Sequence, residues 1–79
     1  MSNKEMYSRV FQDVFCVDEA SLNSDFNFNS VENWDSFTHL TLISELENTF
    51  DVMFEPDDIL HFGGFENGMI ILEKYGVEF

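Results

Sequence analysis

Apolar side chains recur every three or four residues near the start of the chain. This spacing places them on one face of a helix and predicts a helix over Lys4–Phe15. Ser2 and Asn3 stand just before it, and both are residue types that cap helix N-termini. The apolar positions of the predicted face are Met6, Tyr7, Val10, Phe11, Val14 and Phe15.

A second helix is predicted from Asp35 to about Phe50. Asp is a good N-cap because its carboxylate accepts a hydrogen bond from the N–H groups of the first turn. Phe37 and Leu40 begin one apolar stripe of this helix. The other stripe consists of Leu42, Ile43, Leu46 and Phe50.

Two more helices are predicted near the C-terminus. Pro56, followed by two acids, suits the first turn of a short helix, which Gly63-Gly64 then breaks. A last helix is expected over Phe65–Tyr75, with Gly76 placed to end it. Gly68 inside it costs about 1 kcal/mol relative to Ala, and close helix packing would explain its presence.

The stretch from Asp18 to Asp35 reads as a long loop. Its Asn, Ser and Asp side chains bond to nearby backbone and favour turns over helix. Such long loops are uncommon unless they are functional. The predicted fold is therefore all-α: a four-helix bundle with three longer helices and one short one, and a long loop between the first two. The apolar residues expected to anchor the loop to the core are Leu22, Phe26, Phe28, Val31 and Trp34.

Size and charge limit the function. The 79 residues suffice for a single domain over 1–79, and a chain this short is not expected to enclose a deep active site. The formal net charge of −13 disfavours nucleic-acid binding and suits a basic protein surface or a divalent cation, although solubility alone would also explain it. The bases are Lys4, Arg9 and Lys74. Without a signal peptide or a long apolar run, the sequence predicts a cytoplasmic monomer that does not enter a membrane.

The residues that could carry chemistry stand where the long loop meets the second helix. Ser36 directly follows the predicted cap Asp35, at a helix N-terminus whose free N–H groups and dipole favour negative charge. A phosphodiester on Ser36 Oγ would be stabilised there by about 0.3–1 kcal/mol. The alternative is that Asp35 and Ser36 are only capping residues.

A resemblance to a known family favours the chemical role. Asp35-Ser36-Phe37 resembles the Asp-Ser-Leu motif of acyl carrier proteins, and the helical pattern around it is similar over nearly the whole chain. The resemblance implies a four-helix bundle of the acyl carrier type, with 4′-phosphopantetheine attached to Ser36 by a separate Mg²⁺-dependent transferase. The arm's thiol would carry acyl groups for fatty-acid-like, polyketide or other specialised biosynthesis. The chain would then be a carrier and not an enzyme.

The resemblance also implies a docking face on the second helix. Its partners would be the phosphopantetheinyl transferase and acyl-activating or acyl-transferring enzymes with basic patches. Charged side chains at the edge of a protein–protein interface affect association rate and partner choice more than affinity. The residues that match this face are Asp35, Phe37, Leu40, Glu45, Glu47 and Asp51.

The chain departs from the family pattern at a few positions. Phe37 replaces the usual Leu, which puts the identity of the partners in doubt. Gly63-Gly64 stands where many relatives cap the last helix with Thr or Ser. His39, three residues after Ser36, is uncommon there; a packing role is expected for it ahead of a role near the arm. The charge favours acyl over peptidyl cargo, but the cargo itself is not readable.

Other candidate sites fit the sequence less well. The run Asp25–Asn29 begins like a calcium loop but lacks the Gly and Glu that an EF-hand requires, so no metal site is predicted. Cys16 with a histidine could suggest a nucleophile and base, yet a buried packing role is expected for Cys16. His61 is also expected to be structural. The alternative function is an unmodified acidic helical adaptor that binds a basic protein partner.

Overall fold

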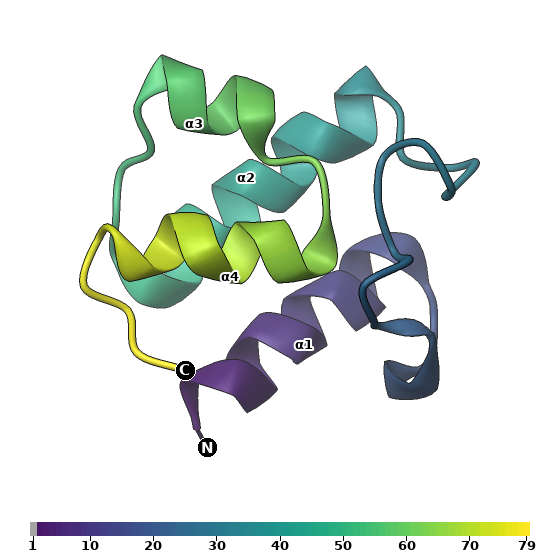
Figure 1. The fold of residues 1–79 in the computed structure, drawn as a ribbon, viewed down its shortest axis with the longest axis horizontal. Coiled ribbons are helices and arrows are strands. Elements are labelled where there is room, and N and C mark those ends of the chain that lie inside the picture. The colour runs from purple at the N-terminus through teal and green to yellow at the C-terminus, as the bar shows by residue number, and fades with distance from the viewer. Residues whose placement is uncertain (1) are drawn as a thin grey trace.

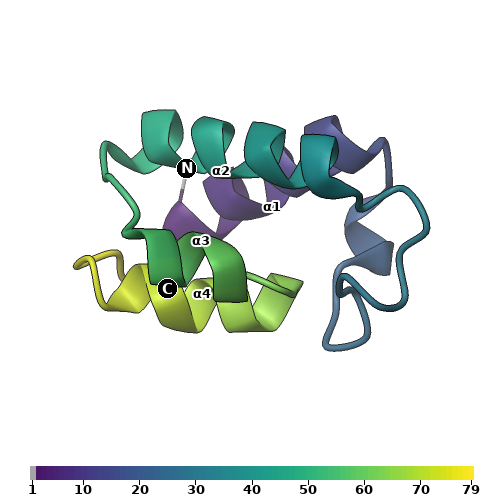
Figure 2. The same cartoon turned by 90° about the horizontal axis from the view of Figure 1, so that it is seen from above.

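The structure is a computed structural model and describes residues 2–79. It contains four helices: α1 (Asn3–Phe15), α2 (Ser36–Phe50), α3 (Pro56–His61) and α4 (Phe65–Glu73). One turn of 3-10 helix, η1 (Glu19–Ser21), interrupts the loop after α1. α3 and α4 lie on the same side of α2, and the α1–α2 loop projects beyond one end of the helices (Figures 1 and 2). The predicted all-α bundle, with three longer helices, one short helix and a long loop, is confirmed.

The start of α1 is fixed by a reciprocal cap. Ser2 Oγ accepts a hydrogen bond from the Glu5 N–H at 3.1 Å, and Glu5 Oε1 accepts one from the Ser2 N–H at 3.2 Å. The bond that the Ser2 N–H donates to the Glu5 carboxylate holds the pKa of Glu5 below its usual value. The helix ends at Phe15, where Cys16 takes a left-handed conformation with φ of 56°. Cys16 is exposed, so the predicted buried packing role is wrong.

Aromatic side chains make up much of the core. Phe11 lies at its centre, where it is fully buried and contacts six other aromatic rings. Tyr7 is also fully buried, and its hydroxyl donates a 2.5 Å hydrogen bond to the Phe65 carbonyl. Burial raises the pKa of the Tyr7 hydroxyl well above its usual value. The rings around Phe11 are those of Tyr7, Phe15, Phe26, Trp34, Phe62 and Phe65.

α4 packs closely against this core through Gly68. A Cβ atom added to Gly68 would overlap the Tyr7 hydroxyl and the ring of Phe62. Close packing therefore does explain this glycine. The helix ends at Glu73, earlier than the predicted Tyr75, and Gly76 follows with a φ of 90° that favours glycine.

The long loop is joined to the α3–α4 connection by backbone hydrogen bonds. Phe28 N–H donates to the Gly63 carbonyl at 2.8 Å, and Phe65 N–H donates to the Phe26 carbonyl at 2.9 Å. Side chains in the loop also bond to nearby backbone as predicted: Asn27 Oδ1 accepts from the N–H of the second and third residues after it. These contacts fix the loop that leads into α2.

Four of the five expected anchors hold the loop to the core. Phe26 and Trp34 are buried, and Leu22 and Val31 pack against the core while partly exposed. Phe28 is a weaker anchor than predicted: its side chain is 49% exposed, and its ring lies edge-on to Trp34 with centroids 6.5 Å apart. No helix within residues 2–79 is long and apolar enough to cross a membrane.

Candidate functional site

Ser36 is exposed at the first position of α2. Asp35 caps the helix directly before it, and its Oδ1 accepts a 2.8 Å hydrogen bond from the Thr38 N–H. This bond holds the pKa of Asp35 below its usual value, so the carboxylate stays charged beside the Ser36 hydroxyl. The local sequence thus folds as predicted, with the hydroxyl accessible to another protein.

Ser36 is one of the residues that line an open groove of about 880 Å³. Its walls come from three parts of the chain: the long loop, the first two turns of α2, and α3 with the connection after it. Most of its surface is apolar, and Asp57 adds a carboxylate. The lining residues are Phe28, Asn29, Ser36, His39, Leu40, Pro56, Asp57, Ile59, Leu60, Phe62 and Gly63.

Large apolar side chains stand exposed around Ser36. Leu40 is 59% exposed and Leu60 75% exposed, and they line the groove together with Phe28. Phe37, next to Ser36, is 81% exposed. Grouped exposed apolar side chains of this kind mark interaction sites on protein surfaces. Three of the predicted docking residues, Asp35, Phe37 and Leu40, are thus exposed within four residues of Ser36 at the start of α2.

Two other predicted docking residues lie at the far end of α2. With a rise of about 1.5 Å per residue, Glu47 is about 16 Å and Asp51 about 22 Å along the axis from Ser36. Glu47 is half-buried, and its Oε2 accepts a 2.9 Å hydrogen bond from the Phe54 N–H. Asp51 is exposed and ends α2 in a left-handed conformation with φ of 53°. Both residues thus take part in the turn that leads towards α3.

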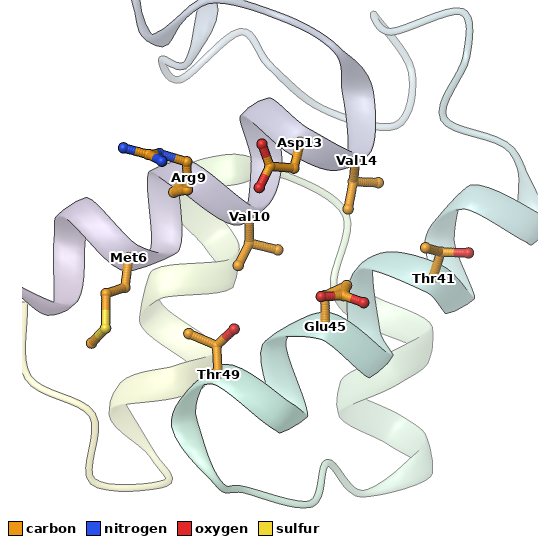
Figure 3. A pocket seen from close by; sticks show the side chains of 8 residues that line it. All are labelled: Met6, Arg9, Val10, Asp13, Val14, Thr41, Glu45 and Thr49. Carbon is orange, nitrogen blue, oxygen red and sulfur yellow. The ribbon is translucent and has the colours of Figure 1, made fainter.

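Glu45 lies on another side of α2. Its side chain lines a second groove, of about 600 Å³, between α1 and α2 (Figure 3). Arg9 and Asp13 of α1 also line that groove. No ion pair joins Arg9 to either carboxylate in the described part of the chain. Glu45 is therefore separate from the groups that surround Ser36.

His39 lies one turn after Ser36 and uses both ring nitrogens. Trp34 Nε1–H donates to Nδ1 at 3.0 Å, and Nε2 lies 2.6 Å from the Ile59 carbonyl oxygen. Ser36 Oγ makes no hydrogen bond to any side chain among residues 2–79. In the described residues, the serine hydroxyl is therefore not hydrogen-bonded to His39 or to another side chain that could serve as a base.

α3 is also tied to the end of α4. Asp58 accepts hydrogen bonds from Lys74 Nζ, at 2.6 Å, and from the Tyr75 hydroxyl. These two donors hold the pKa of Asp58 below its usual value, and the bond to Asp58 raises the pKa of Lys74. α3 forms the wall of the groove opposite α2, and the bonds of Asp58 to Lys74 and Tyr75 thus attach this wall to the end of α4.

Apart from Ser36, His39 and Leu40, the sequence did not single out the residues that line this groove, which come from the long loop, from α3 and from the connection after α3. Phe28 and Asn29 come from the long loop, and Asp57 and Leu60 from α3. No pattern pointed to Phe28: Phe26 and Phe28 are two apart, so alternation in extended backbone would place both side chains on the same side, whereas Phe26 is buried and Phe28 is 49% exposed. For α3, the sequence held no sign of which face would meet α2.

Groups that could bind a metal are not brought together. Within residues 2–79, no three His, Cys, Asp or Glu side chains gather in a way that could hold a metal ion. His61 is exposed, and its Nδ1 lies 2.8 Å from the Asp57 carbonyl oxygen within the same helix.

Comparison with protein-family models, curated proteins and solved structures found no match to this chain. The site is therefore interpreted from its own geometry and from the sequence motif.

Proposed function

We propose that the chain is an acyl carrier protein that bears 4′-phosphopantetheine on Ser36. One observation carries the proposal: Ser36 is exposed at the N-terminus of α2, directly after its capping residue, and lines a mostly apolar groove. This placement agrees with the Asp35-Ser36-Phe37 motif. A serine buried in the bundle would have excluded a transferase.

The chemistry available to Ser36 supports a carrier in preference to an enzyme. Ser36 Oγ makes no hydrogen bond to a basic side chain among residues 2–79, and both nitrogens of His39, the histidine that lines the groove, are engaged by Trp34 and Ile59. The phosphate of the arm would lie at the start of α2, where free N–H groups and the helix dipole favour negative charge. The groove beyond it offers apolar surface along which an arm or its acyl group could lie.

The surroundings of Ser36 also suit transient partners. Exposed apolar side chains supply contact area, while the net charge of −13 attracts basic surfaces at long range. A carrier must visit several enzymes, so fast and weak encounters serve it well. Proposed partners are the phosphopantetheinyl transferase and acyl-activating or acyl-transferring enzymes with basic docking patches.

The test is transfer of the arm in vitro. The full chain is incubated with a phosphopantetheinyl transferase, coenzyme A and Mg²⁺, and its intact mass is measured. We expect the mass to rise by one phosphopantetheine unit in the wild type and in Ser44→Ala, which changes another exposed serine of α2. Ser36→Ala should gain nothing. An unmodified wild type, tested with transferases that load other carriers, would favour the adaptor alternative.

A further inference from the structure

The hydrogen bonds of His39 define a single form of its ring. The indole N–H of Trp34 can only donate, so Nδ1 of His39 must be an acceptor without a proton. The Ile59 carbonyl can only accept, so Nε2 must carry the proton. The His39 ring in this structure therefore carries one proton, on Nε2, which faces α3, while Nδ1 faces Trp34 at the end of the loop.

Both partners of His39 matter for the Ser36 site. Trp34 is two residues before Ser36, is 2% exposed, and contacts Phe15 and Phe26 in the core. Its position therefore fixes where α2 begins. Ile59 belongs to α3 and lines the groove opposite α2. His39 thus connects the element that positions the serine with the wall that faces it.

α3 depends on such polar contacts because it buries little. None of the six residues of Pro56–His61 is buried, and no side chain caps its N-terminus. Side chains bond to its carbonyls near the C-terminus: the Ile59 carbonyl accepts from His39 Nε2 as well as from the Phe62 N–H at 3.4 Å, and the His61 carbonyl accepts from Asn67 Nδ2 at 2.9 Å. In the described residues, the bond from His39 is the one side-chain hydrogen bond between α2 and α3.

We propose that His39 is a positioning residue for the Ser36 site: it holds α3 at a set distance from α2 and so determines the shape of the groove that receives the arm. The inference rests on the proposed function for the role of the groove. The coupling between Trp34, His39 and α3 stands on the geometry alone and is measurable without any arm.

NMR of the ¹⁵N-labelled full chain tests this coupling. Trp34 is the single tryptophan, so one indole N–H signal reports on its bond to His39. In His39→Leu we expect this signal to shift because the bond from Trp34 is lost, and the amides of α3 to exchange with solvent about tenfold faster because the bond to the Ile59 carbonyl is lost. His61→Leu is the matched control, since the His61 side chain is exposed and bonds only to the Asp57 carbonyl within α3. It should leave the indole signal unchanged.

Two conservative variants separate the two bonds and serve if His39→Leu does not fold. His39→Asn keeps an acceptor near the position of Nδ1 and should retain the indole signal while α3 loses protection. His39→Gln keeps a donor near the position of Nε2 and should retain α3 protection while the indole signal shifts. The inference is overturned if α3 amides in the folded His39 variants all exchange at the wild-type rate.

Kinetics of arm transfer then connect the coupling to the site. With His39→Leu, the KM for the carrier should rise about tenfold while kcat changes little, because the groove shifts and the serine hydroxyl does not. An unchanged KM would contradict the positioning role. If the wild type accepts no arm, the proposed function fails, and the NMR result for α3 still decides the coupling. The two failures are thus distinguishable.

Discussion

Gly68 of α4 lies directly against the hydroxyl of Tyr7 on α1, with no room for a methyl group between them. The Tyr7 hydroxyl in turn donates to the Phe65 carbonyl in the first turn of α4. These contacts allow α4 to approach the aromatic core closely. They give a reason for a residue that would otherwise weaken the helix.

Gly68→Ala should therefore destabilise the protein even though Ala favours helices. The added methyl group would overlap Phe62 and Tyr7, and overpacking of this kind costs about 1–3 kcal/mol. Gly63→Ala is the matched control, because the nearest atom to its added Cβ would be 3.8 Å away. Chemical denaturation should show a loss for Gly68→Ala and a change within about 0.5 kcal/mol for Gly63→Ala. Equal stabilities for the two variants would refute the packing explanation.

Asp58 gives the stability a defined pH dependence. Because bonds from Lys74 and Tyr75 lower its pKa in the folded state, ionised Asp58 stabilises the fold above its ordinary pKa of 3.8. That contribution is lost as pH falls through the lowered value. The wild type should therefore be more stable than Asp58→Asn near neutral pH, and the difference should shrink as pH falls below 3.8.

The comparison between these two proteins cancels most of the effect of the net charge of −13, whose repulsion also weakens in acid. Urea denaturation at several pH values measures the difference. When Tyr75→Phe is introduced into both proteins, the difference in stability between them should become smaller but not vanish, since Lys74 remains as a donor to Asp58. A difference that does not depend on pH would show that Asp58 is not stabilised by this cluster.

Replacing Glu47 with alanine is predicted to destabilise the protein more than replacing Glu45 with alanine. Glu47→Ala should lower the free energy of unfolding by about 1–2 kcal/mol, because the Phe54 N–H loses its acceptor. Glu45→Ala should change it by less than about 0.5 kcal/mol, since its exposed carboxylate accepts no such bond. Thermal or chemical unfolding distinguishes the two. Similar losses would mean that the bond to Phe54 contributes little.

Phe37 should matter for partners and not for folding. It is 81% exposed beside Ser36, so Phe37→Ala should leave stability within about 0.5 kcal/mol of the wild type. If it anchors the transferase, the KM for the carrier should rise about tenfold. Ile70→Ala removes an exposed apolar side chain from α4 and is the control, with an unchanged KM. A KM that Phe37→Ala does not alter would remove Phe37 from the docking face.

Local chemistry made much of the fold predictable. The caps Ser2 and Asp35 and the position of Pro56 mark helix starts that the structure confirms. The end of α4 was less predictable, because Tyr75 leaves the helix to bond with Asp58, 17 residues away. Cys16 is exposed because α1 ends just before it in a left-handed turn, which apolar spacing does not reveal.

The candidate site was predictable only in part. Ser36, Asp35 and Phe37 follow from one motif, and the different sides of Glu45 and Glu47 follow from helical geometry, since two positions turn a helix by about 200°. The contribution of α3 depends on tertiary contacts. His39 illustrates this: neither of its partners, Trp34 and Ile59, could be assigned before the helices were placed.

The most direct measurement for the central claim is tandem mass spectrometry of the peptide that contains Ser36, after treatment of the full chain with a transferase, coenzyme A and Mg²⁺. The account predicts a single phosphopantetheine group in phosphodiester linkage to the Ser36 side chain. A group found on another residue, or a peptide that stays unmodified under conditions that load a known carrier, would contradict it.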